Sequence, residues 1–127
     1  MKRIEFRRSP SNPYYPGVFF DADSGVCEIS GESYMEEAYK FYYPLINWLK
    51  EFTEKENGKI ILNIKLIYFN TSTTKCLLDM FEILKKYKNN GNEVEINWFY
   101  DKEDPDMIDE VKDFEKEAEI DIALKGF

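Results

Sequence analysis

The chain has 127 residues and a net charge of -8, because 25 aspartate and glutamate residues outnumber 17 lysine and arginine residues. This length suits a single domain spanning residues 1–127, and the acidic balance argues against a nucleic-acid partner, which needs a basic face to neutralise phosphates. Histidine is absent and cysteine occurs twice. Ser-His-Asp catalysis, Cys-His catalysis and a structural zinc site are therefore excluded, and we expect no metal and no cofactor. No stretch approaches 18 consecutive apolar residues and no signal peptide begins the chain, which predicts a cytoplasmic protein without membrane insertion.

The hydropathy pattern predicts strands and helices in alternation. Short apolar or alternating segments predict strands at residues 3–7, 18–21, 26–30, 60–69, 93–98 and 120–124. Apolar residues at steps of three and four predict helices at 34–55, from the 70–74 stretch to about 88, and at 105–118. Strand-helix-strand units that return to one sheet favour parallel neighbours. The sequence thus predicts an α/β fold, a small sandwich with a mixed sheet, an antiparallel hairpin at its start and helices mainly on one face.

Three local signals refine the helix boundaries. Ser33 and Glu36 have the spacing of a capping box, which predicts a helix start at Tyr34. Pro44 lies inside that helix, so we expect a kink or a break near it. Asp104 before a proline is typical of an N-cap followed by the first helical residue.

The stretch Asn70-Thr71-Ser72-Thr73-Thr74 places four hydroxyls at a strand-to-helix junction. One interpretation is a helix cap, in which Asn70, Thr71 or Ser72 accepts a hydrogen bond from a free amide. The other is a phosphorylation site, because helix N-termini favour dianions and a phosphate would change a contact surface. The two interpretations are compatible. Lys75, in the same turn, could neutralise such a phosphate.

Two further features carry charge or reactivity. The segment 101–121 holds eleven carboxylates and three lysines, so its net charge equals that of the whole chain. It is either the solvated face of the last helix or a docking face for a basic partner. Cys76 has no histidine to activate it and is expected to be a small buried side chain.

A family resemblance follows from several motifs. Residues 62–82 read LNIKLIYFNTSTTKCLLDMFE, and this segment resembles the signature segment of the SiaC-like regulatory phosphoproteins: an apolar strand, then Tyr-(Leu/Phe)-Asn-Thr-Ser-Ser, a lysine and an apolar helix. Three shorter motifs also resemble that family: Gly31-Glu32-Ser33-Tyr34, Ile46-Asn47-Trp48-Leu49 and Trp98-Phe99-Tyr100-Asp101. The resemblance covers about residues 9 to 124.

The resemblance implies a STAS-like fold and a signalling switch protein that is not an enzyme. By the family pattern, Thr71 would be phosphorylated by a histidine-kinase-like protein kinase and dephosphorylated by a PP2C-type phosphatase. The unphosphorylated form would bind and activate a GGDEF diguanylate cyclase, and so control cyclic di-GMP and biofilm formation. The partner-binding switch loop would contain Tyr68, Asn70, Ser72, Thr73 and Lys75. This chain departs from the pattern at Thr73, usually serine, and at Thr74, often aliphatic.

Two other classes of function stay open at this point. In the first, the chain is a STAS-like anti-sigma-factor antagonist or another interaction module, and Thr71 is only a helix cap. In the second, it is a small-molecule-binding or weakly catalytic domain that uses carboxylates, with Asp21, Glu32, Glu36 and Asp101 as candidates. A deep apolar pocket with converging polar groups would favour the second class.

Overall fold

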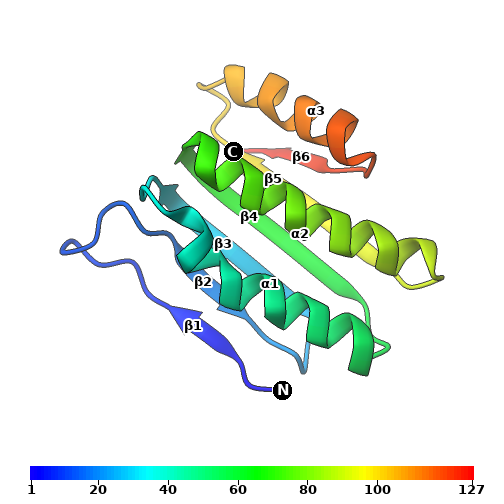
Figure 1. The fold of residues 1–127 in the computed structure, drawn as a ribbon. Coiled ribbons are helices and arrows are strands. Elements are labelled where there is room, and N and C mark those ends of the chain that lie inside the picture. Colours follow the sequence, from blue (N-terminus) through cyan, green and yellow to red (C-terminus); the bar gives the residue numbers. More distant parts are fainter.

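The computed structural model describes all 127 residues as one sheet with three helices (Figure 1). The strands are β1 (Ile4–Phe6), β2 (Gly17–Phe20), β3 (Val26–Ser33), β4 (Ile60–Phe69), β5 (Val94–Tyr100) and β6 (Ala123–Gly126). The helices are α1 (Ala38–Lys55), α2 (Thr71–Asn89) and α3 (Asp106–Ala118). None of these helices combines the length and the apolar composition needed to cross a membrane.

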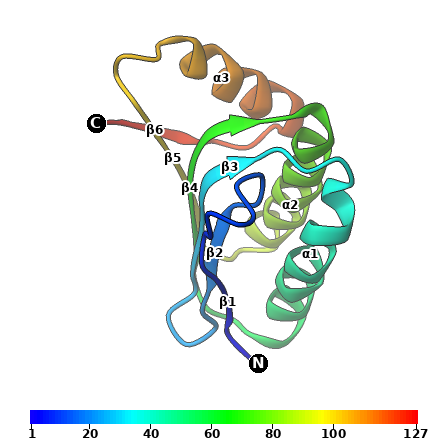
Figure 2. The ribbon, with the colours of Figure 1, turned by 90° about the vertical axis from the view of Figure 1, so that its left-hand side faces the viewer.

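The strands lie in the sheet in chain order, from β1 to β6. β1, β2 and β3 pair antiparallel, whereas β3, β4, β5 and β6 pair parallel. Each parallel step passes through one helix to the next strand in the same direction, and right-handed crossovers of this kind place all helices on one face. Figure 2 shows α1 and α2 together on one side of the sheet. The predicted mixed sheet with an antiparallel start is confirmed.

The core lies between the sheet and the helices. On β4 the helix-facing side chains are buried, whereas the alternate residues are partly or fully exposed. Phe114 of α3 stacks on Trp98 of β5 and packs edge-on against Phe81 of α2, so α3 covers the same face. The opposite face is mixed: it carries exposed Ile67 and a 2.7 Å ion pair between Lys65 and Glu28. One face of the sheet is thus core and the other is partly exposed, which confirms the prediction of helices mainly on one face.

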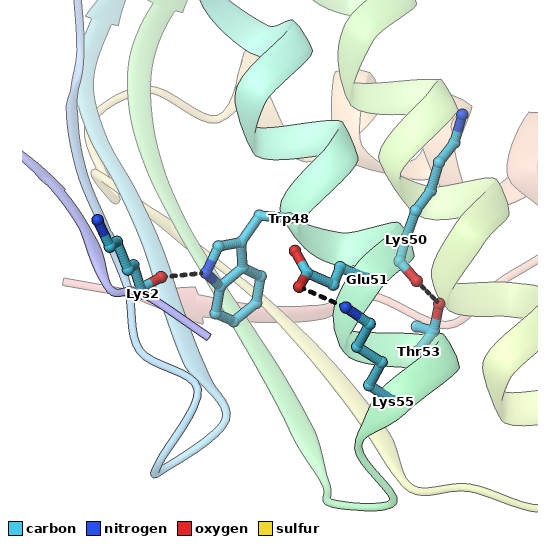
Figure 3. A network of polar contacts seen from close by, with 6 residues as sticks. All are labelled: Lys2, Trp48, Lys50, Glu51, Thr53 and Lys55. Carbon is cyan, nitrogen blue, oxygen red and sulfur yellow. Dashed lines mark hydrogen bonds and ion pairs between the residues drawn. The ribbon is translucent and has the colours of Figure 1, made fainter.

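The N-terminal edge of the sheet is fastened to α1 (Figure 3). The indole Nε1 of Trp48 donates a hydrogen bond to the carbonyl of Lys2 at 2.9 Å. Further along the same helix Lys55 pairs with Glu51 at 3.0 Å, one helical turn apart. The tryptophan contact gives β1, a strand of only three residues, a tertiary anchor beyond its pairing with β2.

The predicted start of the first helix is wrong. Ser33 is the last residue of β3 and fully buried, and α1 begins five residues later at Ala38. Pro44 does not break α1, which continues from Ala38 to Lys55. Pro44 has no N–H to donate to the carbonyl one turn earlier, but Pro44 is exposed, so water can hydrogen-bond that carbonyl instead. The buried neighbours Tyr42 and Leu45 keep the helix packed on the sheet.

The predicted start of the last helix also needs correction. α3 begins at Asp106, and no side chain caps its first turn, so Asp104 is not the N-cap. The final strand runs over Ala123–Gly126 and not over 120–124. Ile120 and Ile122, which gave that segment its apolar pattern, are buried in the core before the strand pairing with β5 begins.

Candidate functional site

The hydroxyl-rich stretch lies where β4 ends and α2 begins, with Asn70 between them. This is the edge of the sheet at which the parallel strands β3, β4, β5 and β6 all end (Figure 1). The carboxyl-terminal edge of parallel strands is the usual place for binding sites in α/β folds. The connection from β3 to α1 runs beside the stretch, since Asn70 N donates to Ser33 O at 3.2 Å.

Asn70 is a clamp between α2 and the β3–α1 connection. Its Oδ1 accepts a hydrogen bond from the Thr73 amide at 2.9 Å, which makes Asn70 the N-cap of α2. Its Nδ2 donates to the carbonyl of Met35 at 2.8 Å. The alternative in which Thr71 is the helix cap is therefore wrong, because Asn70 supplies that cap.

Ser72 caps a different helix from its own. Its Oγ accepts a hydrogen bond from the amide of Ala38 at 3.1 Å, and Ala38 is the first residue of α1. The residue before α1, Glu37, provides no side-chain cap. The cap of α1, which the Ser33–Glu36 spacing assigned to Ser33, is thus supplied by Ser72 of α2.

Thr73 belongs to a buried chain of hydroxyls. Its Oγ1 lies 2.7 Å from Ser33 Oγ and donates to Ser33 O at 3.1 Å, and Ser33 Oγ lies 2.8 Å from the Tyr42 phenol. All three side chains are fully buried. Burial raises the pKa of Tyr42 well above its usual range, so the phenol stays neutral and serves only as a hydrogen-bonding group. This chain joins the ends of β3, α1 and α2 beneath Thr71.

Thr71 differs from its three hydroxyl neighbours. It is exposed, and its hydroxyl makes no hydrogen bond within the chain, whereas Thr74 donates to Asn70 O at 3.3 Å. Lys75 is also exposed and forms no ion pair. The structure therefore assigns a structural contact to every hydroxyl of the stretch except that of Thr71.

Tyr68, which the family resemblance placed in the switch loop, lies on the surface near the end of β4. It is 54% exposed, and its ring centroid lies 5.0 Å from that of Tyr34, itself exposed. The Tyr34 phenol and the nearby carboxylate of Glu32 raise the pKa of Tyr68. Tyr34 in turn lies beside Tyr14, at 6.2 Å between ring centroids, so three tyrosines form an exposed row at the end of β3 and β4. Sequence reasoning missed Tyr14 and Tyr34 in this surface.

The other sequence candidates do not form a site. Asp21 lies in the β2–β3 turn and accepts a hydrogen bond from Ser24, at the opposite end of the strands from Glu32 and Asp101. No group of three or more acidic or cysteine side chains is arranged to hold a metal ion. The largest hollow, of about 790 Å³, is a surface groove whose lining is mostly exposed: Tyr14, Tyr15, Tyr34, Met35, Glu36, Glu37, Lys40 and Phe41. Cys76 is buried as expected, and burial raises its pKa to about 11.

Comparison with known proteins shows the family to which the chain belongs. Residues 9–126 match the SiaC family, described as regulatory phosphoproteins. The chain belongs to the SiaC family. It is thus a regulator and not an enzyme, and the resemblance of the motifs is confirmed. An uncharacterised protein of Pseudomonas aeruginosa (strain UCBPP-PA14) is 24% identical over 117 residues, which cover 92% of this chain and 93% of the relative.

Solved structures show the same fold. The crystal structure of apo-SiaC from Pseudomonas aeruginosa is similar with a TM-score of 0.89 and 22% identity, over 98% of this chain and 99% of that one. SiaC in the crystal structure of the diguanylate cyclase SiaD with its activator SiaC, from the same organism, is similar with a TM-score of 0.90 and 22% identity, over 98% and 99% of the two chains. The SiaC family fold accordingly extends over nearly the whole molecule.

Proposed function

We propose that this chain is a phosphorylation-controlled switch whose acceptor is Thr71. A partner kinase adds the phosphate and a PP2C-type phosphatase removes it. The unphosphorylated form binds and activates a diguanylate cyclase with a GGDEF domain, and thereby raises cyclic di-GMP and controls biofilm formation. Two findings support this function: the chain belongs to a family of regulatory phosphoproteins, and its fold is that of SiaC, the activator in the complex with the cyclase SiaD.

The observation that carries the proposal is the isolation of the Thr71 hydroxyl. An acceptor must reach the active site of a kinase, and the Thr71 side chain is exposed and its hydroxyl makes no hydrogen bond within the chain. Thr73 is fully buried and Ser72 caps α1, so phosphorylation of either would break contacts that hold the fold. Phosphorylation of Thr71 leaves all of these contacts in place.

The same position explains how a phosphate could control binding. A phosphate adds a charge of about -1.5 to -2 at neutral pH. A dianion buried in a flat interface without a basic partner loses its hydration and is strongly unfavourable. The exposed row of Tyr14, Tyr34 and Tyr68 offers an aromatic contact surface at the same edge of the sheet as Thr71. A phosphate on Thr71 would expel a partner whose interface covers both.

The proposal is tested by incubating the purified chain with ATP and each candidate protein kinase of the same organism, then mapping phosphate by mass spectrometry. We expect one phosphate on Thr71, none in Thr71→Ala, and an unchanged level in the matched control Thr74→Ala. Phosphate on another residue, or normal incorporation into Thr71→Ala, would contradict the assignment.

The second test measures binding to the cyclase. We expect the unphosphorylated chain and Thr71→Ala to bind and activate it, and the phosphorylated chain to do neither. Both phosphorylated and unphosphorylated chains activating the cyclase equally would refute the switch. If phosphorylation instead releases the chain from a different partner, such as an anti-sigma factor, the switch is supported and the cyclase is the wrong partner.

A further inference from the structure

Lys75 is the basic side chain closest to Thr71 along α2. The two residues are four positions apart in a continuous helix, so they lie on the same face with Cβ atoms about 5–6 Å apart. The Cα–Cβ bonds of a helix tilt toward its N-terminus, which directs the Lys75 stem toward Thr71. Both side chains are exposed. A phosphate on Thr71 would thus lie within reach of the Lys75 ammonium group.

Lys75 also occupies an unfavourable place for a lysine. The N-terminal end of a helix carries a partial positive charge that disfavours cations, and α2 has no acidic residue in its first turn to compensate. By contrast, Lys85 and Lys86 of the same helix form ion pairs with Glu119 and Glu82. Lys75 forms none, although Asp79 follows it one turn later. The unmodified protein therefore holds an uncompensated cation beside a free hydroxyl.

Residues 31–40 and the first half of α2, up to Leu84, contain two cations, Lys40 and Lys75. Three carboxylates also lie near this end of α2. Glu32 is close enough to Tyr68 to raise its pKa. Glu36 and Glu37 lie on the β3–α1 connection, which accepts a hydrogen bond from Asn70 and donates one to Ser72. The one lysine nearby on α1, Lys40, is paired with Glu37 at 2.6 Å. These carboxylates would repel a phosphate, and of the two cations Lys75 is the one without an ion pair.

We propose that Lys75 is the intramolecular ligand of a phosphate on Thr71, and that the pair changes the charge of the docking surface. The ammonium of Lys75 donates hydrogen bonds to the phosphate oxygens and favours the dianionic form of the phosphate. The local charge changes from +1 in the free form to about -1 in the phosphorylated form. Lys75 is then no longer available to a carboxylate of a partner. This inference rests on the proposed function for its biological role, but its physical test does not need the kinase.

The test uses the full chain with phosphothreonine incorporated at position 71 during translation. The second pKa of the phosphate is measured by phosphorus NMR in three proteins: the otherwise unchanged chain, Lys75→Gln and Lys88→Gln. Lys88 is an exposed lysine near the far end of the same helix and serves as the matched control. We expect Lys75→Gln to raise this pKa by about 0.2 to 0.4 and Lys88→Gln to leave it unchanged, as for a helical pair one turn apart.

A second measurement follows the Lys75 side chain itself. We expect the nitrogen NMR signal of its ammonium group to shift when phosphothreonine replaces threonine, and the shift to shrink in high salt because ions screen the pair. Equal phosphate pKa values in Lys75→Gln and Lys88→Gln, or an ammonium signal that does not move, would overturn the inference. A failure of the kinase to modify Thr71 would instead count against the proposed function alone.

Discussion

The clamp made by Asn70 leads to a prediction about stability. Asn70→Ala removes the N-cap of α2, which costs about 1 kcal/mol. It also leaves the carbonyl of Met35, a residue only 5% exposed, without its amide donor, which costs about 1 kcal/mol more. We expect urea unfolding to show a free energy of unfolding lower by about 2 kcal/mol, and thermal unfolding to show a melting temperature lower by about 8 °C.

Two control variants separate the contributions. Asn70→Asp keeps an oxygen for the Thr73 amide, and its charge is favoured at a helix N-terminus, but it cannot donate to Met35. We expect it to unfold between the wild type and Asn70→Ala. Asn57→Ala changes an exposed asparagine without side-chain hydrogen bonds and should have little effect. The clamp is refuted if Asn70→Ala and Asn57→Ala have the same unfolding midpoint.

Three other predictions follow from buried or crowded groups. Thr73→Val should lower the free energy of unfolding by about 1–3 kcal/mol, because Ser33 loses a buried hydrogen-bond partner. Thr71→Val should change it by less than about 0.5 kcal/mol, and urea titration of both variants measures the difference. Burial raises the pKa of the Cys76 thiol to about 11, so the thiol should resist thiol-modifying reagents until the chain unfolds. The folded state retains the thiol proton above the pH at which the unfolded state loses it, so the free energy of unfolding should fall as pH rises above about 9. Glu110 is exposed, but partial desolvation and the carboxylates of Asp104, Asp106 and Asp113 raise its pKa, so its charge costs stability above that pKa. Glu110→Gln should raise the urea midpoint at pH 7, and by less in high salt or at pH 4.

The elements whose apolar residues recur at a regular spacing were predicted well from the sequence. β4 and α2 each carry several turns or alternations of apolar residues, and both lie where the pattern placed them. The topology followed from the alternation of strands and helices, since right-handed connections leave few arrangements for one small sheet. These features depend on side chains close together in the sequence, and the sequence displays them directly.

The start of α1 was mispredicted because its cap comes from another element. Ser33 and Glu36 fit a capping box by spacing, but Ser33 bonds to Thr73, 40 residues later, and the Ala38 amide bonds to Ser72. Local pattern cannot report a contact of this range. One signal did exist: Ser33 continues the alternation of buried residues Cys27, Ile29 and Gly31 in β3, which places its hydroxyl inside.

The phase of α2 accounts for the different roles of the hydroxyls. Successive helical residues are rotated by about 100°, so a residue three or four positions before a buried one lies on the same face. Cys76 and Leu77 are buried, and counting back from them places Thr73 inside, as the structure shows. Thr71 is two positions earlier, about 200° around the helix, and therefore faces solvent together with Lys75. The free hydroxyl is thus determined by the apolar residues that follow it, because the same packing that buries Thr73 requires Thr71 to point outward.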